Sequence, residues 1–328
     1  MTMRTIIAGD IGGTNTRLAL FEQGRPVFRW TRPSRNYPEF YPLFKEFLAH
    51  CPVASPQQLV VCLAVAGVIE GNRRAKGTNI PWIIDSERIE TDTGCQKCII
   101  INDFEAAAWG VTTLQQGQYV QVGGPRPQTG STMAILGAGT GLGQAIIPGD
   151  STGRYMVIHS EGGHAGFAPE SREEIALLSY LMERFGHVSV ERVLSGQGLV
   201  NIYSFLKKEP ADKLEDGPRG DLLAPDITRR AIEESDEVCS RTVELFCRIY
   251  GAEAGNLALK CLPYGGVFVA GGIAPVILPF IQKGGFIEAF EAKGCMREVM
   301  KKIPVLIVKE PDLGLIGAAV KAAQQQTA

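Results

Sequence analysis

The sequence predicts an α/β protein with mixed sheets and two domains, and three observations support this prediction. The chain has 328 residues, a length that favours two domains at roughly 100–200 residues each. Strand-like apolar segments alternate with segments of helical periodicity in both halves. Glycine, with 38 residues, is well above the usual ~7% and clusters after the predicted strands. We expect a small domain of residues 1–113 and 309–328, and a large domain of residues 114–308.

The first half of the chain begins with three strands, expected at residues 5–9, 16–22 and 27–32. Short turns join them directly, which predicts an antiparallel meander. A helix follows at residues 41–49, where apolar positions recur at helical spacing, and buried strands are expected at 59–66 and 98–101. Three strands, helix, strand, helix and strand in this order give a mixed sheet.

The second half loosely echoes the beginning of the first. A Gly/Pro-rich stretch at 123–127 predicts a loop near the domain boundary. A strand at 131–136, a glycine turn at 137–143 and a returning strand at 144–148 follow it. This strand, turn and strand echo residues 6–20, as two related halves around a cleft would.

Helices dominate the rest of the chain. Ser171 and Glu174 form a capping box, behind which one helical face carries Ile175, Leu178, Met182 and Phe185. Further elements are expected in this order: helices at 191–206 and 227–260, the second broken by Gly251 and Gly255, a strand with a glycine turn at 266–272, a helix beginning at Pro275, a strand at 305–309 and a small-residue helix around Gly314 and Gly317.

Composition and charge exclude several classes of protein. The 33 Lys and Arg against 35 Asp and Glu give a net charge of −2, so no basic field recruits nucleic acid or an acidic membrane. The longest apolar run, residues 59–69, is shorter than the ~20 residues of a bilayer-spanning helix. Without a signal-like leader we expect a soluble cytoplasmic protein. The eight cysteines should stay reduced, and the CxxC of Cys95 and Cys98 lacks partners for a zinc site.

The first glycine turn follows the first predicted strand. Its glycines allow main-chain N–H groups to point inward at phosphate oxygens as an anion-binding nest, although a hairpin turn chosen for its backbone angles alone is an equal alternative. Asp10 could hold Mg²⁺ there, through water. The residues of this turn are Gly9, Asp10, Ile11, Gly12, Gly13 and Thr14.

The second turn has four glycines over residues 137–143, more than a hairpin needs. It is not a Rossmann fingerprint, because a strand and not a helix follows it, and it lacks the Gly-Lys-Ser/Thr of a Walker A loop. A third turn contains Gly271 and Gly272. Together the turns predict a nucleotide held between two domains, with Gly139, Thr140 and Gly141 against the phosphates.

Six motifs taken together resemble the bacterial glucokinase family over nearly the whole chain. The resemblance implies the two-domain hexokinase and actin-like ATPase (ribonuclease H-like) fold with an interdomain cleft, ATP and Mg²⁺ as cofactors, D-glucose as substrate and a homodimer. Related zinc-binding sugar kinases carry a Cys-rich signature where Phe167, Ala168 and Pro169 stand here, which favours the zinc-free branch. The motifs are GDIGGTN (9–15), INDFEAAA (101–108), LGAGTGLG (136–143), EGGHAGFAP (161–169), HVSVERVLSGQGL (187–199) and FVAGGIAP (268–275).

The resemblance also implies roles for five residues, each of which has a plainer interpretation. Asp103 is the expected general base toward the sugar 6-hydroxyl, while Asn-Asp before a helix is also good N-cap chemistry. Asn102, Glu161, His164 and Glu191 supply the donors and acceptors that a ring of sugar hydroxyls requires. Taken singly, the glutamates could be solvated surface residues and the histidine a packed one.

The sequence therefore predicts an ATP-dependent glucokinase that makes glucose 6-phosphate at the entry to glycolysis. A kinase for another hexose or for an N-acetylated hexose is the main alternative. A non-catalytic sugar-binding regulator is a weaker one, because such regulators need a DNA-reading segment and this chain is slightly acidic.

Overall fold

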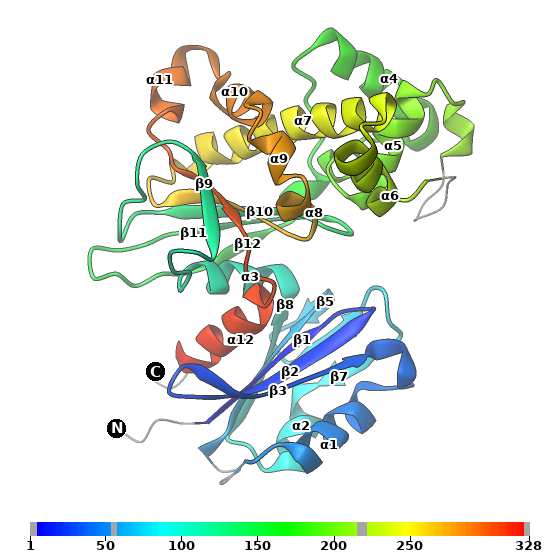
Figure 1. The fold of residues 1–328 in the computed structure, drawn as a ribbon. Helices are drawn as coiled ribbons and strands as arrows, with labels where there is room; N and C mark the ends of the chain where they lie inside the picture. Colours follow the sequence, from blue (N-terminus) through cyan, green and yellow to red (C-terminus); the bar gives the residue numbers. More distant parts are fainter. Residues whose placement is uncertain (1–4, 54–57, 215–221, 325–328) are drawn as a thin grey trace. The chain divides into compact units, whose positions relative to one another are not determined.

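The structure is a computed structural model that describes residues 5–53, 58–214 and 222–324. Its contacts divide the chain into two compact units: unit 1 is Met1–Leu114 with Pro311–Ala328, and unit 2 is Gln115–Glu310. Figure 1 draws both and labels the larger part of their helices and strands. The domain limits expected from the sequence, after residues 113 and 308, stay a prediction.

Unit 1 is built on a five-stranded mixed sheet. Its strand order is β3-β2-β1-β4-β8. The first three strands form the expected antiparallel meander, and β4 and β8 run parallel to β1. The strands are β1 (Ile6–Ile11), β2 (Asn15–Glu22), β3 (Arg25–Pro33), β4 (Val60–Val65) and β8 (Lys97–Asn102).

The helices of unit 1 are α1 (Phe40–His50), α2 (Ser86–Thr93), α3 (Asp103–Val111) and α12 (Leu313–Gln324). In Figure 1, α12 runs beside α3 although it comes from the other end of the chain. The two helices pack closely, and only glycine fits at position 317, because a Cβ there would lie 1.7 Å from the Ala106 carbonyl oxygen. A short 3₁₀ helix, η1 (Ser34–Asn36), precedes α1.

A small antiparallel sheet in unit 1 was missed by the sequence analysis. It consists of β5 (Gly67–Glu70), β6 (Arg74–Gly77) and β7 (Ile83–Asp85). These strands are short and mostly half-exposed or exposed, so they lack the apolar run that marks β4. The hydrophobic alternation on which strand prediction depends is too brief here.

Unit 2 contains a six-stranded mixed sheet in the order β12-β11-β10-β13-β14-β9. The Gly/Pro-rich stretch at 123–127 begins at the last residue of β9, inside this unit, and its predicted place near the domain boundary stays a prediction. The strands are β9 (Tyr119–Gly123), β10 (Met133–Ala138), β11 (Leu142–Ile147), β12 (Ile158–Ser160), β13 (Gly266–Ala270) and β14 (Val305–Val308).

Helices make up most of the rest of unit 2. The longest helix of the described residues is α7, and it continues through Gly251 and Gly255, contrary to the expected breaks. A Cβ at Gly251 would lie 2.0 Å from the Phe286 carbonyl oxygen, so this glycine allows α10 to pack against α7. The helices are α4 (Arg172–Phe185), α5 (Gly196–Leu206), α6 (Ala224–Arg229), α7 (Glu237–Cys261), α8 (Ile273–Val276), α9 (Leu278–Ile281), α10 (Gly285–Glu291) and α11 (Arg297–Met300).

Short helical turns connect these elements. They are η3 (Gly162–His164), η4 (Val190–Arg192), η5 (Ala211–Lys213), the π-helical η6 (Arg230–Glu234) and η7 (Gly294–Met296). The segment from 191 therefore begins with a 3₁₀ turn, and its α-helix starts only at Gly196. Pro275 is the third residue of α8 and does not begin it.

Helix α4 confirms one prediction and corrects another. The Ser171 hydroxyl accepts a hydrogen bond from the Glu174 N–H at 3.2 Å, as the capping box predicts. The apolar face of Ile175, Leu178, Met182 and Phe185 is only partly directed inward. Leu178 and Phe185 pack against the core, whereas Ile175 and Met182 are about half exposed, and the fully buried residues are Leu177 and Leu181. The two apolar stripes of this helix lie side by side, and sequence spacing alone does not say which one faces the core.

The eight cysteines are free thiols, as expected, and Cys239 and Cys247 are both buried in α7. Among the described residues, no helix combines the length and the apolar character that crossing a bilayer requires.

Candidate active site

Three parallel strands of unit 1 end at the same edge of its sheet. The pairings of Ile11 with Val65 and of Val65 with Asn102 place the last residues of β1, β4 and β8 in register. Carboxyl ends of parallel strands are where α/β folds bind ligands. The first glycine turn and the residue pair Asn102 and Asp103 are thus brought together at this edge.

The first glycine turn is a short hairpin connection between β1 and β2. The Gly12 N–H donates to the Asn15 carbonyl at 3.0 Å, and the Ser34 hydroxyl donates to the Gly12 carbonyl at 2.6 Å. A Cβ at Gly13 would lie 2.9 Å from the Cβ of Asn79. Close packing against Asn79 therefore requires a glycine at position 13.

Asp10 precedes this turn and is surrounded by charge. Its Oδ2 lies 3.4 Å from Nη1 of its strand partner Arg17, and its carboxyl group lies near Gly314 at the start of α12. Burial raises the pKa of Asp10, Arg17 lowers it, and the negative charge of Asp312 raises it. A partly buried carboxylate with a second one nearby is stabilised by a cation, and carboxylate oxygen is a ligand type that Mg²⁺ prefers.

Metal ligation here would depend on more than side chains. In the described part of the chain, no three His, Cys, Asp or Glu residues gather as a metal cluster. Mg²⁺ commonly keeps several waters and is held by one or two carboxylates together with phosphate oxygens. Asp10 therefore fits a Mg²⁺ that arrives with a nucleotide.

Asn102 and Asp103 lie at the junction of β8 and α3. Asn102 is the N-cap, and its Oδ1 accepts from the N–H groups of Phe104 (2.8 Å) and Glu105 (3.2 Å). The N-cap interpretation is thus confirmed for Asn102, and the cap uses only its oxygen. Asp103 is the first helical residue, where the helix dipole stabilises an ionised carboxylate.

A buried ion pair that no sequence motif indicated attaches helix α3 to helix α12. Lys321 of α12 lies with its Nζ 3.3 Å from Oε1 of Glu105, and the side chains are only 17% and 9% exposed. The Trp109 indole N–H donates to the same carboxylate oxygen at 3.4 Å. The pair joins α12 to α3 two residues after Asp103.

The second glycine turn, in unit 2, is shorter than predicted. Gly137 and Gly143 pair across the hairpin as strand residues, so the turn is Gly139 to Gly141. A Cβ at Gly139 would have no heavy atom within 4 Å, so the main chain is open on this side. Backbone N–H groups that are not covered by a side chain suit phosphate oxygens.

The third turn lies at the same edge of the unit 2 sheet. The pairing of Gly137 with Ala270 aligns the ends of the parallel strands β10 and β13. Gly271 has φ +84°, and its Cβ would lie 2.3 Å from the Ala138 carbonyl oxygen. Gly272 is open in the same sense as Gly139. Both turns thus offer bare main chain, which fits the phosphates of a nucleotide.

The three predicted sugar residues of unit 2 lie together. Nε2 of His164 is 3.8 Å from Oε2 of Glu161, and its Nδ1 is 4.0 Å from Oε1 of Glu191. The Glu161, His164 and Glu191 side chains are 84%, 63% and 32% exposed. A Cβ at Gly163 would lie 2.1 Å from the Leu142 carbonyl oxygen, so the loop packs closely against β11.

A buried polar network lies under the loop that carries Glu161. The Gln144 amide donates to Oε1 of Glu253 at 2.7 Å, and the Asn256 amide donates to Oε2 at 3.1 Å. A Cβ at Gly162 would lie 2.4 Å from Oε1 of Gln144. Glu253 on α7 was not predicted, because a single glutamate inside a helix carries no local signal.

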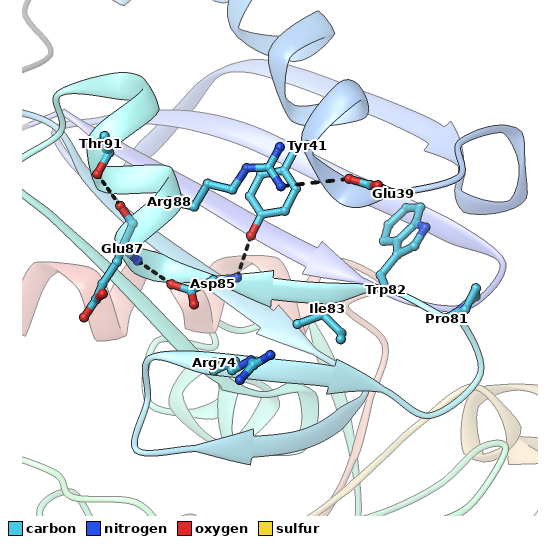
Figure 2. A pocket seen from close by; sticks show the side chains of 10 residues that line it. All are labelled: Glu39, Tyr41, Arg74, Pro81, Trp82, Ile83, Asp85, Glu87, Arg88 and Thr91. Atoms are coloured by element: carbon cyan, nitrogen blue, oxygen red, sulfur yellow. Dashed lines mark hydrogen bonds and ion pairs between the residues drawn. The ribbon is translucent and has the colours of Figure 1, made fainter.

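A cavity of about 590 Å³ in unit 1 is lined by none of the predicted site residues. Figure 2 shows the ten side chains that line it. The Tyr41 hydroxyl accepts from the Asp85 N–H at 2.8 Å, and the Arg88 guanidinium lies 3.6 Å from the Tyr41 ring centroid. Much of its polar lining is thus engaged in internal contacts, and we assign it no part in the site.

The fold belongs to the hexokinase and actin-like ATPase class. Its mixed sheets carry glycine turns at the carboxyl ends of their parallel strands. A solved glucokinase from an Antarctic psychrotroph has a TM-score of 0.85 at 30% identity, covering 98% of this chain and 100% of that one. A ROK family glucokinase from Streptomyces griseus has a TM-score of 0.64 at 23% identity, over 98% and 99% of the two chains. The predicted fold class is confirmed.

A family model described as Glucokinase matches residues 7–325. A glucokinase of Nostoc punctiforme is 42% identical over 346 aligned residues, covering 98% of this chain and all of that protein. The chain belongs to the glucokinase family, and the resemblance stated from its motifs is confirmed.

Proposed function

We propose that the chain transfers the terminal phosphoryl group of ATP to the 6-hydroxyl of D-glucose, giving glucose 6-phosphate and ADP. The observation that carries this proposal is the family match over residues 7–325, together with 42% identity to a glucokinase along its whole length. The Streptomyces griseus glucokinase was solved with glucose and AMPPNP.

In unit 1, Asp103 is the proposed general base. Its carboxylate would accept the proton of the 6-hydroxyl as that oxygen attacks the terminal phosphorus. A loose transition state needs positioning and charge neutralisation more than full deprotonation, so Asp103 orients the hydroxyl as well. The Asn102 amide N–H₂ would donate to a neighbouring sugar hydroxyl, since the helix cap uses only Oδ1.

In unit 2, Glu161, His164 and Glu191 are the proposed ligands of the sugar hydroxyls. Two carboxylates, each within 4.0 Å of the same imidazole, offer acceptors and donors to adjacent hydroxyls of one ring. An epimer would leave one of these groups unmatched, at a cost of about 1–3 kcal/mol. This difference would select among hexoses.

The glycine turns are the proposed phosphate ligands. In unit 2, the main chain of Gly139, Thr140 and Gly141 and of Gly271 and Gly272 would contact ATP. In unit 1, the turn from Gly9 to Thr14 would add N–H groups, and Asp10 would hold Mg²⁺ through water. Bound Mg²⁺ supplies positive charge that offsets the charge of the phosphate oxygens.

The test is an assay of ADP release with purified protein, ATP and Mg²⁺ over a panel of hexoses and N-acetylated hexoses. Glucose should give the highest kcat/KM. Faster turnover of another sugar would favour the alternative hexose kinase, and sugar binding without ADP release would favour the regulator. A homodimer and a cytoplasmic location stay predictions.

A further inference from the structure

The Glu191 carboxylate is bonded to the second glycine turn as well as facing the sugar residues. Its Oε2 accepts a hydrogen bond from the Leu142 N–H at 2.8 Å, and Leu142 is the residue directly after Gly141. Its other oxygen, Oε1, is the one that lies 4.0 Å from Nδ1 of His164. One side chain therefore contacts the main chain of the proposed phosphate turn and the proposed sugar cluster.

A second bond joins the same two segments. The Gly196 N–H donates to the Gly139 carbonyl at 2.8 Å, so the beginning of α5 is attached to the other arm of the turn. The Ser195 hydroxyl donates to the Glu191 carbonyl at 2.8 Å and caps α5 by accepting from the Gly198 N–H. The segment from Glu191 to Gly196 thus holds the turn on both sides.

Gly141 makes room for this arrangement. A Cβ at this position would lie 2.4 Å from Oε2 of Glu191 and 3.2 Å from its carboxyl carbon. Its φ is not in the left-handed region, so the absence of a side chain here is required by the carboxylate and not by the backbone conformation. A glycine of the phosphate turn therefore determines where a sugar ligand lies.

We propose that Glu191 is a positioning residue that links the two substrates: its carboxylate holds the Gly139 to Gly141 turn through Leu142, so that sugar and nucleotide each favour binding of the other. The inference rests on the proposed function of these residues. A sugar hydroxyl that donates to Oε1 restricts the carboxylate, and the restricted carboxylate holds the turn in its phosphate-binding form. Linkage requires the effect to be reciprocal.

The experiment measures binding of glucose and AMPPNP to the wild type and to Gly141→Ala by titration calorimetry. Gly139→Ala is the matched control for glucose affinity alone, because Gly139 is itself a proposed phosphate ligand. The added methyl group displaces the Glu191 carboxylate in the first variant and meets open space in the second. In the wild type, saturating glucose should tighten AMPPNP binding by about fivefold or more, a usual size for such coupling.

Gly141→Ala should weaken glucose binding, in the absence of any nucleotide, by about tenfold or more, because a charged hydrogen-bond partner is displaced. It should also reduce the coupling to less than about twofold, below the usual range. Gly139→Ala should leave the glucose Kd within about twofold of the wild type, as expected where no interaction is lost.

A purely structural role for the Leu142 bond would lower Tm without changing the glucose Kd or the coupling. That result would overturn this inference but not the proposed function. So would an equal loss of glucose affinity in Gly139→Ala, or the absence of coupling in the wild type. Absence of glucose binding by the wild type would overturn the proposed function together with it.

If Gly141→Ala does not fold, two substitutions of Glu191 test whether its bond to the Leu142 N–H carries the coupling. Glu191→Gln keeps an oxygen that can accept from the Leu142 N–H, whereas Glu191→Ala does not. Both should weaken glucose binding. At saturating glucose only the glutamine variant should retain the coupling to AMPPNP, and equal coupling in the two variants would contradict the inference.

Discussion

The hairpins β1–β2 of unit 1 and β10–β11 of unit 2 have the same topology and different chemistry. In each, an antiparallel pair is joined by a glycine turn, and a parallel strand, β4 or β13, lies beside the first strand. The unit 1 hairpin carries Asp10 and its ion pair with Arg17. The unit 2 hairpin has no acid in its turn, and a carboxylate from another segment, Glu191, braces it.

This difference indicates that the two units contribute different chemistry to the site. Unit 1 gathers buried charge and the helix N-terminus that carries Asp103, which suits proton acceptance and a metal. Unit 2 gathers open main chain and an exposed polar cluster, which suits phosphate and sugar recognition. Substitutions in unit 1 should therefore act mainly on turnover, and those in unit 2 mainly on affinity.

The largest effect is expected from Asp103→Asn. An amide cannot accept the proton, so kcat should fall by about 10²–10⁴-fold, the usual contribution of general acid–base catalysis. The glucose Kd, measured by calorimetry, should change much less because the side chain keeps its shape. Near-normal turnover would remove Asp103 from the proposed role.

His164→Ala should act in the opposite way. Losing one hydrogen-bond partner of the sugar costs about 1–3 kcal/mol, so the glucose KM should rise by roughly 5–150-fold at that cost, with a smaller change in kcat. His159→Ala is the matched control, since His159 is exposed on β12 and outside the cluster. Similar glucose KM values for the two variants would contradict the assignment of sugar affinity to the polar cluster of unit 2.

Asp10→Asn should raise the Mg²⁺ concentration needed for half-maximal turnover by about tenfold, as loss of a ligand charge does. Activity at saturating Mg²⁺ should recover in part. Asp92→Asn, an exposed carboxylate of α2, should leave the requirement unchanged. An unchanged Mg²⁺ dependence in Asp10→Asn would place the metal elsewhere.

Gly317→Ala should destabilise unit 1 by about 1–3 kcal/mol, because the new methyl group overpacks the contact between α12 and α3. Gly314→Ala in the same helix has space for its methyl group and should be neutral or slightly stabilising. Urea denaturation followed by far-ultraviolet circular dichroism compares the two. Equal stabilities would show that α12 and α3 do not pack as described.

Much of the fold was predictable because its signals are local. Strands β1, β4, β8 and β13 are apolar runs bounded by glycine or polar residues, and Ser171 with Glu174 marks the start of α4. The buried face of α4, the continuous α7 and the small sheet β5–β7 were not predictable in this way. They depend on which neighbour packs against them, as Phe286 does against Gly251.

The candidate site, like the fold, could be predicted only where its signals are local in the sequence. The motifs predicted the turns, Asn102 with Asp103, and the cluster of Glu161, His164 and Glu191. They gave no indication of the pair of Glu105 with Lys321, of Glu253, or of the bond from Leu142 to Glu191. These contacts join residues far apart in the sequence, and their side chains have common solvent-exposed alternatives.

The most direct test of the proposed roles of the two units is a crystal structure of the protein with glucose and AMPPNP bound. The account predicts a carboxylate oxygen of Asp103 within about 2.6–3.2 Å of the sugar 6-hydroxyl oxygen, the reach of a general base, and the phosphates against Gly139 to Gly141. An Asp103 carboxylate directed away from that hydroxyl, with another group accepting its proton, would contradict it.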